Sequence, residues 1–234
     1  MDPRQLFIDD RHTGMCVYCG ANPDTRDHVP SKVLLDGPYP PELPVVGECN
    51  KCNASFSLDE QYLACFLDCV ICGSAEASDL HRPNVKRILK GSPALHRRIE
   101  GALKREEADN LIWEPEAERV RNVILKLARG HAAYELYPKL ENPAVVSFAP
   151  LQILSDSEIS APAQLADGKL DLCPEIGSRA FLRTFGKPPD RLPLSGDWIV
   201  VQPDRYRYAV AETGGVIVRM VLSEYLGCEV VWDI

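Results

Sequence analysis

Long apolar runs are missing from this sequence. No window approaches the ~18 uncharged apolar residues that a membrane-spanning helix requires, and the first residues, Met1–Gln5, lack the charged-then-apolar layout of a secretory signal. We therefore expect a cytoplasmic protein with no membrane partner. Of its 234 residues, 45% are hydrophobic and 26% are charged, which is typical of a soluble globular protein with one large domain or two to three small ones.

Basic residues are in deficit over the chain as a whole. Lys and Arg number 26 against 34 Asp and Glu, and the net charge of −8 argues against a simple nucleic-acid binder. The deficit is uneven, because residues 80–140 carry 13 basic and 8 acidic side chains. A polyanion is expected to contact this segment if it contacts the chain at all. A helical stretch with a solvated Lys/Arg face is an equally good interpretation.

Cysteine, by contrast, is abundant, with nine residues. In a cytoplasmic chain a disulfide framework is not expected, and the spacing indicates metal binding instead. Three pairs have the form Cys-x-x-Cys, namely Cys16/Cys19, Cys49/Cys52 and Cys69/Cys72. Residues 1–56 are rich in proline and turns, so they cannot form long helices or bury much apolar surface. A metal ion would explain how this segment stays folded.

The first two pairs together form the strongest signal. Cys16-Val17-Tyr18-Cys19-Gly20 has the form of a zinc knuckle, in which the glycine lets the chain turn back toward the metal. Four thiolates make a closed tetrahedral site, the usual structural zinc arrangement. The segment between the two pairs is long for a plain zinc ribbon, so we expect a functional element within it.

That segment contains Arg26-Asp27-His28-Val29-Pro30, and Asn53 directly follows Cys52. The order Cys-x-x-Cys, Asp-His-x-Pro, Cys-x-x-Cys-Asn and then a helix resembles the HNH endonuclease family, a branch of the ββα-metal (His-Me finger) nucleases, in its zinc-stapled four-cysteine type. The resemblance covers about residues 14–75. It implies an N-terminal ββα-metal motif and the hydrolysis of phosphodiester bonds.

The resemblance also implies roles for individual residues. His28 would be the general base, and a neutral imidazole suits that role because it can accept a proton at neutral pH. Asp27 and Asn53 would hold a catalytic Mg²⁺ or Mn²⁺ through oxygen ligands. Arg26 and Lys32 flank the base and could meet phosphate, although plain surface charge explains them equally well. The remaining ligands, those for structural zinc, would be Cys16, Cys19, Cys49 and Cys52.

The chain departs from the family pattern at two places. The middle Asn of the motif is absent from the stretch 43–48, and Phe56 stands where a Lys is often found. A catalytically degenerate, zinc-stabilised module that binds nucleic acid or protein is therefore the alternative function. DNA is the expected substrate on family grounds, while nothing in the motif excludes RNA. A protein partner or a homo-oligomer would help an acidic chain of this kind to reach nucleic acid.

The residues that follow the cysteine-rich segment predict helices. Ser57 and Glu60 form a capping-box pattern, which predicts a helix from Ser57 to near Gly73. Cys65, Cys69 and Cys72 would lie on one face of it, and packing is the favoured interpretation of these thiols. Two short helices are expected within 84–107, broken at Ser92-Pro93 with Ser92 as the cap, and a longer one over 116–137. On that last helix, His131 falls on the apolar face as a core residue, whereas Arg119, Asn122, Lys126 and Arg129 fall opposite.

The last third of the chain predicts strands. They are expected at 145–148, 198–201, 206–210, 215–221 and 228–232, joined by hairpin turns at 202–204 and 212–215. Cys173, Cys228 and the three tryptophans are interpreted as packing residues. The predicted fold class is α+β, with an HNH ββα-metal domain at 1–75, a basic helical segment at 80–140 and a β-rich, mostly antiparallel domain at 141–234.

Overall fold

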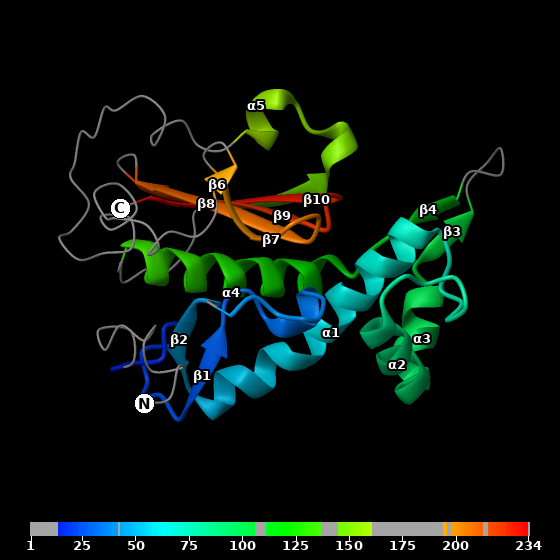
Figure 1. Cartoon of the computed structure of the whole chain (residues 1–234), viewed down its shortest axis with the longest axis horizontal. Coiled ribbons are helices and arrows are strands. Elements are labelled where there is room, and N and C mark those ends of the chain that lie inside the picture. The colour runs from blue at the N-terminus through cyan, green and yellow to red at the C-terminus, as the bar shows by residue number, and fades with distance from the viewer. Residues whose placement is uncertain are drawn as a thin grey trace. The chain divides into compact units, whose positions relative to one another are not determined.

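The computed structural model describes residues 14–41, 43–105, 111–136, 145–160, 194–195, 198–212 and 215–233 (Figure 1). The chain divides into two compact units. The first comprises Met1–Asn53 with Ile124–Ile234, and the second comprises Ala54–Val123. The sequence-based division into domains at 1–75, 80–140 and 141–234 stays a prediction.

The first unit begins with a β-hairpin that leads into a helix. Strand β1 (Thr25–His28) pairs antiparallel with β2 (Val45–Glu48), and the short 3-10 helix η3 (Lys32–Leu34) lies in the connection between them. Helix α1 (Asn50–Cys72) follows directly. The order along the chain is therefore strand, strand, helix.

Helix α1 begins at Asn50, so the predicted start at Ser57 was wrong. The Asp24 carboxylate accepts a hydrogen bond from the backbone N–H of Asn50 at 3.0 Å. This side chain caps the helix from an earlier part of the chain, which a local capping pattern cannot reveal. The predicted end was correct, because the helix stops at Cys72 and Gly73 adopts a left-handed φ of +69°.

The second unit holds the rest of α1 and the short helices. Its further elements are α2 (Pro83–Gly91), α3 (Pro93–Glu100), β3 (Leu103–Arg105), β4 (Leu111–Trp113) and the start of α4 (Ala117–Leu136). The predicted break at Ser92-Pro93 is confirmed, but the Ser92 side chain makes no capping hydrogen bond. The second short helix ends at Glu100 rather than 107, since β3 pairs with β4 in an antiparallel hairpin.

Helix α4 matches the prediction of 116–137 to within one residue at each end. Its apolar stripe is fully buried, as the helical spacing indicated, and consists of Val120, Val123, Ile124, Leu127 and Ala128. Within the described part of the chain, neither this helix nor any other is sufficiently long and apolar to span a membrane.

The rest of the first unit is an antiparallel sheet of six strands in the order β5-β10-β9-β8-β7-β6. All five predicted strands are present. The strands are β5 (Val145–Pro150), β6 (Leu194–Ser195), β7 (Trp198–Gln202), β8 (Tyr206–Glu212), β9 (Gly215–Leu222) and β10 (Leu226–Asp233). The 3-10 helix η4 (Leu151–Ile153) and helix α5 (Asp156–Ile159) follow β5. The α+β fold class with a C-terminal antiparallel sheet is confirmed.

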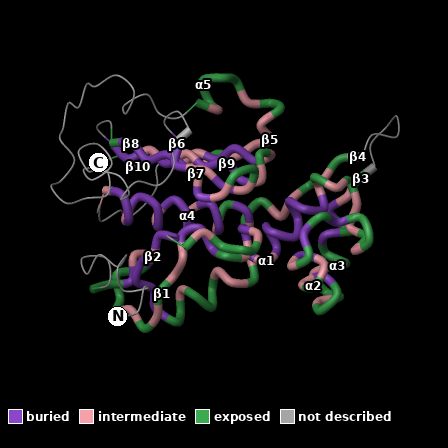
Figure 2. Tube along the Cα trace, in the orientation of Figure 1, coloured by how far each residue is buried: buried purple, intermediate pink, exposed green. Residues whose placement is uncertain are grey.

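Within the first unit, the part of α4 from Ile124 onward lies between the sheet and the β1–β2 hairpin, and Figure 2 shows it as a mostly buried element. On the sheet side, the His131 ring is fully buried and stacks on Tyr208 at a centroid distance of 3.7 Å. On the hairpin side, a Cβ added to Gly130 would lie 2.7 Å from the Val29 side chain. The interpretation of His131 as a core residue is confirmed.

The cysteines and tryptophans outside the first two pairs are mostly packing residues. Cys65, Cys69 and Cys228 are buried, as are Trp198 and Trp232. Trp113 makes an edge contact with Phe66 at a centroid distance of 6.1 Å. Cys72 differs from the packing prediction, because it is partly exposed at the end of α1. Cys173 lies outside the described residues.

Candidate functional site

The four cysteines of the first two pairs converge. The sulfur atoms of Cys16, Cys19, Cys49 and Cys52 all lie within 4.8 Å of one another. Those of Cys19 and Cys49 are 3.7 Å apart. A tetrahedral zinc site with Zn–S bonds of about 2.3 Å has sulfur–sulfur edges of about 3.8 Å. The donor set and its spacing therefore fit a closed zinc site.

The first pair sits on a tight knuckle. The Cys16 carbonyl accepts from the Gly20 N–H at 2.7 Å, and the Cys16 N–H donates to the Ala21 carbonyl at 2.7 Å. Gly20 has a φ of +75°, a conformation that side-chain-bearing residues rarely adopt. A further backbone bond, from Val17 N–H to the Gly47 carbonyl at 3.1 Å, fixes the knuckle to β2. The glycine identified in the sequence therefore supplies the expected turn.

The second pair lies where β2 gives way to α1. Cys49 precedes the helix and Cys52 lies in its first turn. The Cys52 backbone N–H lowers the pKa of the Cys49 thiol to about 7, whereas burial raises the pKa of Cys52 and of Cys16. Cys49 therefore supplies a thiolate more readily than Cys16 or Cys52. Because zinc binds cysteine as the thiolate, the affinity of the site would depend on pH.

His28 is the last residue of β1 and is partly exposed. Its Nδ1 atom is buried and has no hydrogen-bond partner among the described residues. Burial lowers the pKa of this imidazole, the positive charge of Lys32 lowers it further, and Asp27 opposes both effects. His28 is therefore neutral at neutral pH and can accept a proton. An unpaired buried nitrogen of this kind needs an explanation, and a catalytic role is one of them.

Asp27 is held by two donors that the sequence did not connect with it. Its Oδ2 atom accepts from the Tyr18 hydroxyl at 2.6 Å and lies 2.8 Å from the Lys126 ammonium. Lys126 also donates to the Ser31 hydroxyl at 3.0 Å, and its side chain is only 3% exposed. The placement of Lys126 on a solvated face was therefore wrong.

Other polar side chains of α4 also pair with carboxylates. Arg119 pairs with Asp59 and Glu116, and Asn122 donates to Asp59 at 2.7 Å. Lys126 continues the same stripe one turn further on. A basic stripe at helical spacing can therefore pack against carboxylates instead of facing solvent. The solvated-face interpretation of this helix does not hold.

The other predicted site residues are exposed. Arg26 lies two residues before His28 on β1, so both side chains emerge on the same face of the hairpin. Lys32 lies in η3 with its ammonium 5.7 Å from the centre of the Tyr39 ring. Asn53 lies in the first turn of α1, where its N–H donates to the Cys49 carbonyl at 3.1 Å. The roles of Arg26, Lys32 and Asn53 stay predictions.

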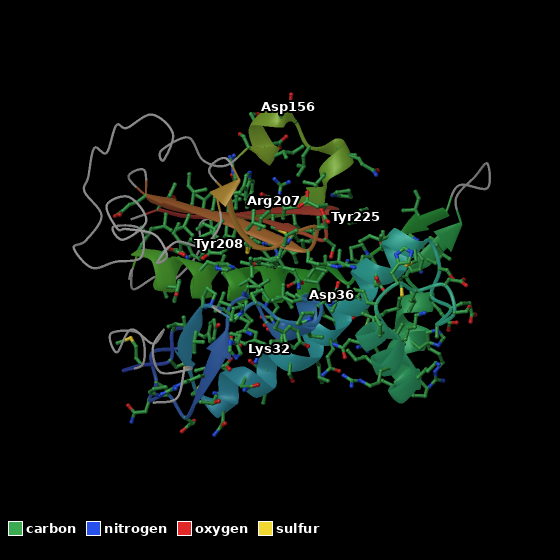
Figure 3. The ribbon with its side chains drawn as sticks, viewed as in Figure 1. Lys32, Asp36, Asp156, Arg207, Tyr208 and Tyr225 are labelled. Atoms are coloured by element: carbon green, nitrogen blue, oxygen red, sulfur yellow. The ribbon has the colours of Figure 1, made fainter. Side chains whose placement is uncertain are left out.

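The sheet holds the segment that follows His28. The Asp36 N–H donates to Gln202 Oε1, and Gln202 Nε2 donates to the Asp36 carbonyl, both at 2.8 Å. The Arg205 guanidinium pairs with the Asp36 carboxylate. Figure 3 labels Lys32 and Asp36 on this segment and Tyr208 on the sheet. The C-terminal sheet, whose role the sequence left open, therefore fixes the connection between β1 and β2.

Comparisons with known proteins identify no relative of this chain. No family model matches the chain, and no match is found among the curated proteins or the solved structures. Function is therefore inferred from the site itself, since a fold alone does not imply an activity.

Proposed function

We propose that this protein is a divalent-metal-dependent endonuclease of the HNH type, which hydrolyses phosphodiester bonds with His28 as the general base. One observation carries the proposal. A histidine with a buried, unpaired Nδ1 atom ends the first strand of a hairpin, and a four-cysteine cluster anchors that hairpin to the helix that follows. DNA is the proposed substrate, on the resemblance alone.

Each residue of the proposed site would have its own role in the hydrolysis. His28 takes the proton of the attacking water, which its lowered pKa allows at neutral pH. Asp27 and Asn53 would hold a Mg²⁺ or Mn²⁺ ion, which supplies positive charge to the phosphoryl and leaving oxygens when bound. Because Oδ2 of Asp27 already contacts Lys126 and Tyr18, the ligand atom would be Oδ1. Arg26 and Lys32 would contact the flanking phosphates.

One observation favours the second candidate, a zinc-stabilised binding module without catalysis. The Lys126 ammonium neutralises the Asp27 carboxylate in a largely buried ion pair. A neutralised carboxylate is a weaker ligand for a divalent cation than a free one, because the cation must compete with the ammonium. The two candidates therefore differ in whether a second metal ion binds beside His28.

A plasmid-cleavage assay with Mg²⁺ or Mn²⁺ tests the proposal. Wild type is expected to cut, His28→Ala to lose cleavage with its zinc content intact, and the control His96→Ala to cut like wild type. Cutting by His28→Ala would show that another group is the base. Absence of cutting on both DNA and RNA would favour the binding module.

Binding of Mn²⁺, followed by electron paramagnetic resonance, separates the two candidates without an activity readout. A catalytic site is expected to bind one Mn²⁺ ion in addition to the zinc. Replacing the exposed Asn53 by alanine is expected to weaken that binding. A module that only binds nucleic acid or protein would take up no Mn²⁺ at this position.

A further inference from the structure

A second group of metal-ligand side chains lies in the other unit, away from the four cysteines. A carboxylate oxygen of Asp68, the Cys72 sulfur and a ring nitrogen of His81 all lie within 4.8 Å of one another. Asp68 and Cys72 are four residues apart on α1 and so share one face of the helix. His81 follows after a short loop, two residues before the start of α2 at Pro83.

The carboxylate in this group is incompletely satisfied. Asp68 is only 2% exposed, and its Oδ2 accepts from the Arg82 backbone N–H at 3.2 Å. Its Oδ1 is buried and has no hydrogen-bond partner among the described residues. A buried, unpaired carboxylate oxygen costs free energy unless something binds it.

A neighbouring carboxylate shows the contrast. Asp79 lies in the loop between Cys72 and His81, and both of its oxygens accept from serine hydroxyls, Ser74 at 2.7 Å and Ser78 at 2.8 Å. Both oxygens of Asp79 therefore have a hydrogen-bond donor, whereas one oxygen of Asp68 has none among the described residues. A thiol and an imidazole, from Cys72 and His81, lie close to the Asp68 carboxylate.

We propose that Asp68, Cys72 and His81 form a second metal site, which binds a Zn²⁺ ion through one oxygen, one sulfur and one nitrogen. The charges balance, because a carboxylate, a thiolate and a neutral imidazole together neutralise a divalent cation. Thiolate and imidazole ligands select zinc over magnesium or calcium. Water fills the fourth position, since His81 is exposed and Cys72 is partly exposed.

The site explains why Cys72 departs from the other cysteines of α1. Cys65 and Cys69 are fully buried and pack as small apolar groups. Cys72 lies one turn beyond Asp68, at the point where the helix ends and the chain turns back. A metal ion here would tie the last turn of α1 to the loop that leads into α2.

Metal analysis of the full chain, purified without chelator under reducing conditions, tests the site. Wild type is expected to contain two zinc ions per chain, and His81→Gln to contain one. His81 is exposed, so its substitution is not expected to disturb folding. The matched control is His96→Gln, in the same unit but outside the ligand group, and it is expected to retain both ions.

A Co²⁺ titration of the chelator-stripped protein gives an independent readout. Wild type is expected to show a second binding step with a thiolate-to-cobalt charge-transfer band. In His81→Gln that step should weaken by more than ~100-fold, because even an outer-shell partner of a ligand is worth 10–100-fold in affinity. One zinc ion in wild type, or an unchanged second step in His81→Gln, would overturn the proposal.

Discussion

The Lys126 ammonium lies 2.8 Å from the Asp27 carboxylate, and the two side chains are 3% and 13% exposed. This ion pair joins α4 to β1 at the residue next to the proposed general base. The Tyr18 hydroxyl, on the knuckle between Cys16 and Gly20, donates to the same oxygen at 2.6 Å. Helix, strand and knuckle therefore meet at one carboxylate atom, and the position of His28 depends on all three.

Replacing Lys126 by Met should destabilise the first unit. The substitution leaves the Asp27 charge largely buried without its cation, and breaking such a pair costs about 3 kcal/mol. The free energy of unfolding in urea measures the effect. Lys90→Met, on the exposed surface of α2, is the matched control and should change stability by less than about 0.5 kcal/mol. Equal stability of the two variants would show that the ion pair contributes nothing.

Cys49→Ser should release one zinc ion and unfold the β1–β2 hairpin together with the start of α1, which the four cysteines join. Ligand loss and unfolding are coupled because such a site does not exist in the unfolded chain. Zinc content and circular dichroism measure the two events. Cys69→Ala removes a buried thiol outside both ligand groups and should retain the zinc of the first site. An unchanged melting curve for Cys49→Ser would contradict the four-cysteine assignment.

Local patterns in the sequence predicted most of the elements. The apolar stripe of α4 fixed that helix to within one residue at each end, and alternation located the strands of the sheet. These signals depend on spacing along a single element, which the sequence displays directly. The two Cys-x-x-Cys pairs were informative for the same reason, because their fixed spacing indicated the cluster in which the four sulfur atoms converge.

The errors arose where distant segments act on an element. Helix α1 starts at Asn50 because Asp24 caps it from before the hairpin. Lys126 is buried because Asp27 faces it, although its position opposite the apolar stripe of α4 suggested solvent. In both cases the decisive partner is a carboxylate far away in the chain. Neither propensity nor periodicity carries that information.

The lowered pKa of His28 gives a third prediction, on how the stability of the protein depends on pH. Its pKa is lowered in the folded protein, so between the folded pKa and the ordinary value of 6.5 the unfolded chain binds more protons. Stability should therefore rise with pH through that window, and His28→Gln should remove this contribution. Cleavage should likewise fall only below pH 6.5.

Nuclear magnetic resonance titration of the His28 ring measures this pKa directly. Lys32→Gln removes a positive charge that lowers the pKa of His28, so the midpoint should move upward. Lys90→Gln, which removes a charge from α2, should leave the midpoint unchanged. A midpoint above 6.5 in the wild type would contradict the neutral base.

The cap on α1 gives a fourth prediction. Asp24→Ala removes the acceptor for the Asn50 N–H and should cost about 1 kcal/mol of stability. Asp24→Asn is the matched control, because an asparagine oxygen can also accept this hydrogen bond. Zinc affinity should fall in the alanine variant alone, since Cys49 and Cys52 flank the capped position. Equal stability and equal zinc affinity of the two variants would mean that the hydrogen bond to Asn50 contributes to neither.

Gly130 gives the last prediction, because α4 approaches the residue after His28 there. A Cβ at this position would meet the two Val29 methyl groups at 2.7 and 2.9 Å. Alanine favours a helix over glycine by about 1 kcal/mol, whereas overpacking costs about 1–3 kcal/mol. Gly130→Ala should therefore destabilise the protein and displace His28, with a loss of cleavage.

The double variant Gly130→Ala/Val29→Ala separates overpacking from other causes. Removing the two Val29 methyl groups frees the space that the new Cβ needs, so part of the stability should return relative to Gly130→Ala. Gly91→Ala, where the new Cβ has no neighbour within 4 Å, should not destabilise the protein. A Gly130→Ala variant as stable as wild type would mean that α4 and the hairpin can move apart at low cost. The position of His28 would then depend on the Asp27–Lys126 ion pair rather than on packing.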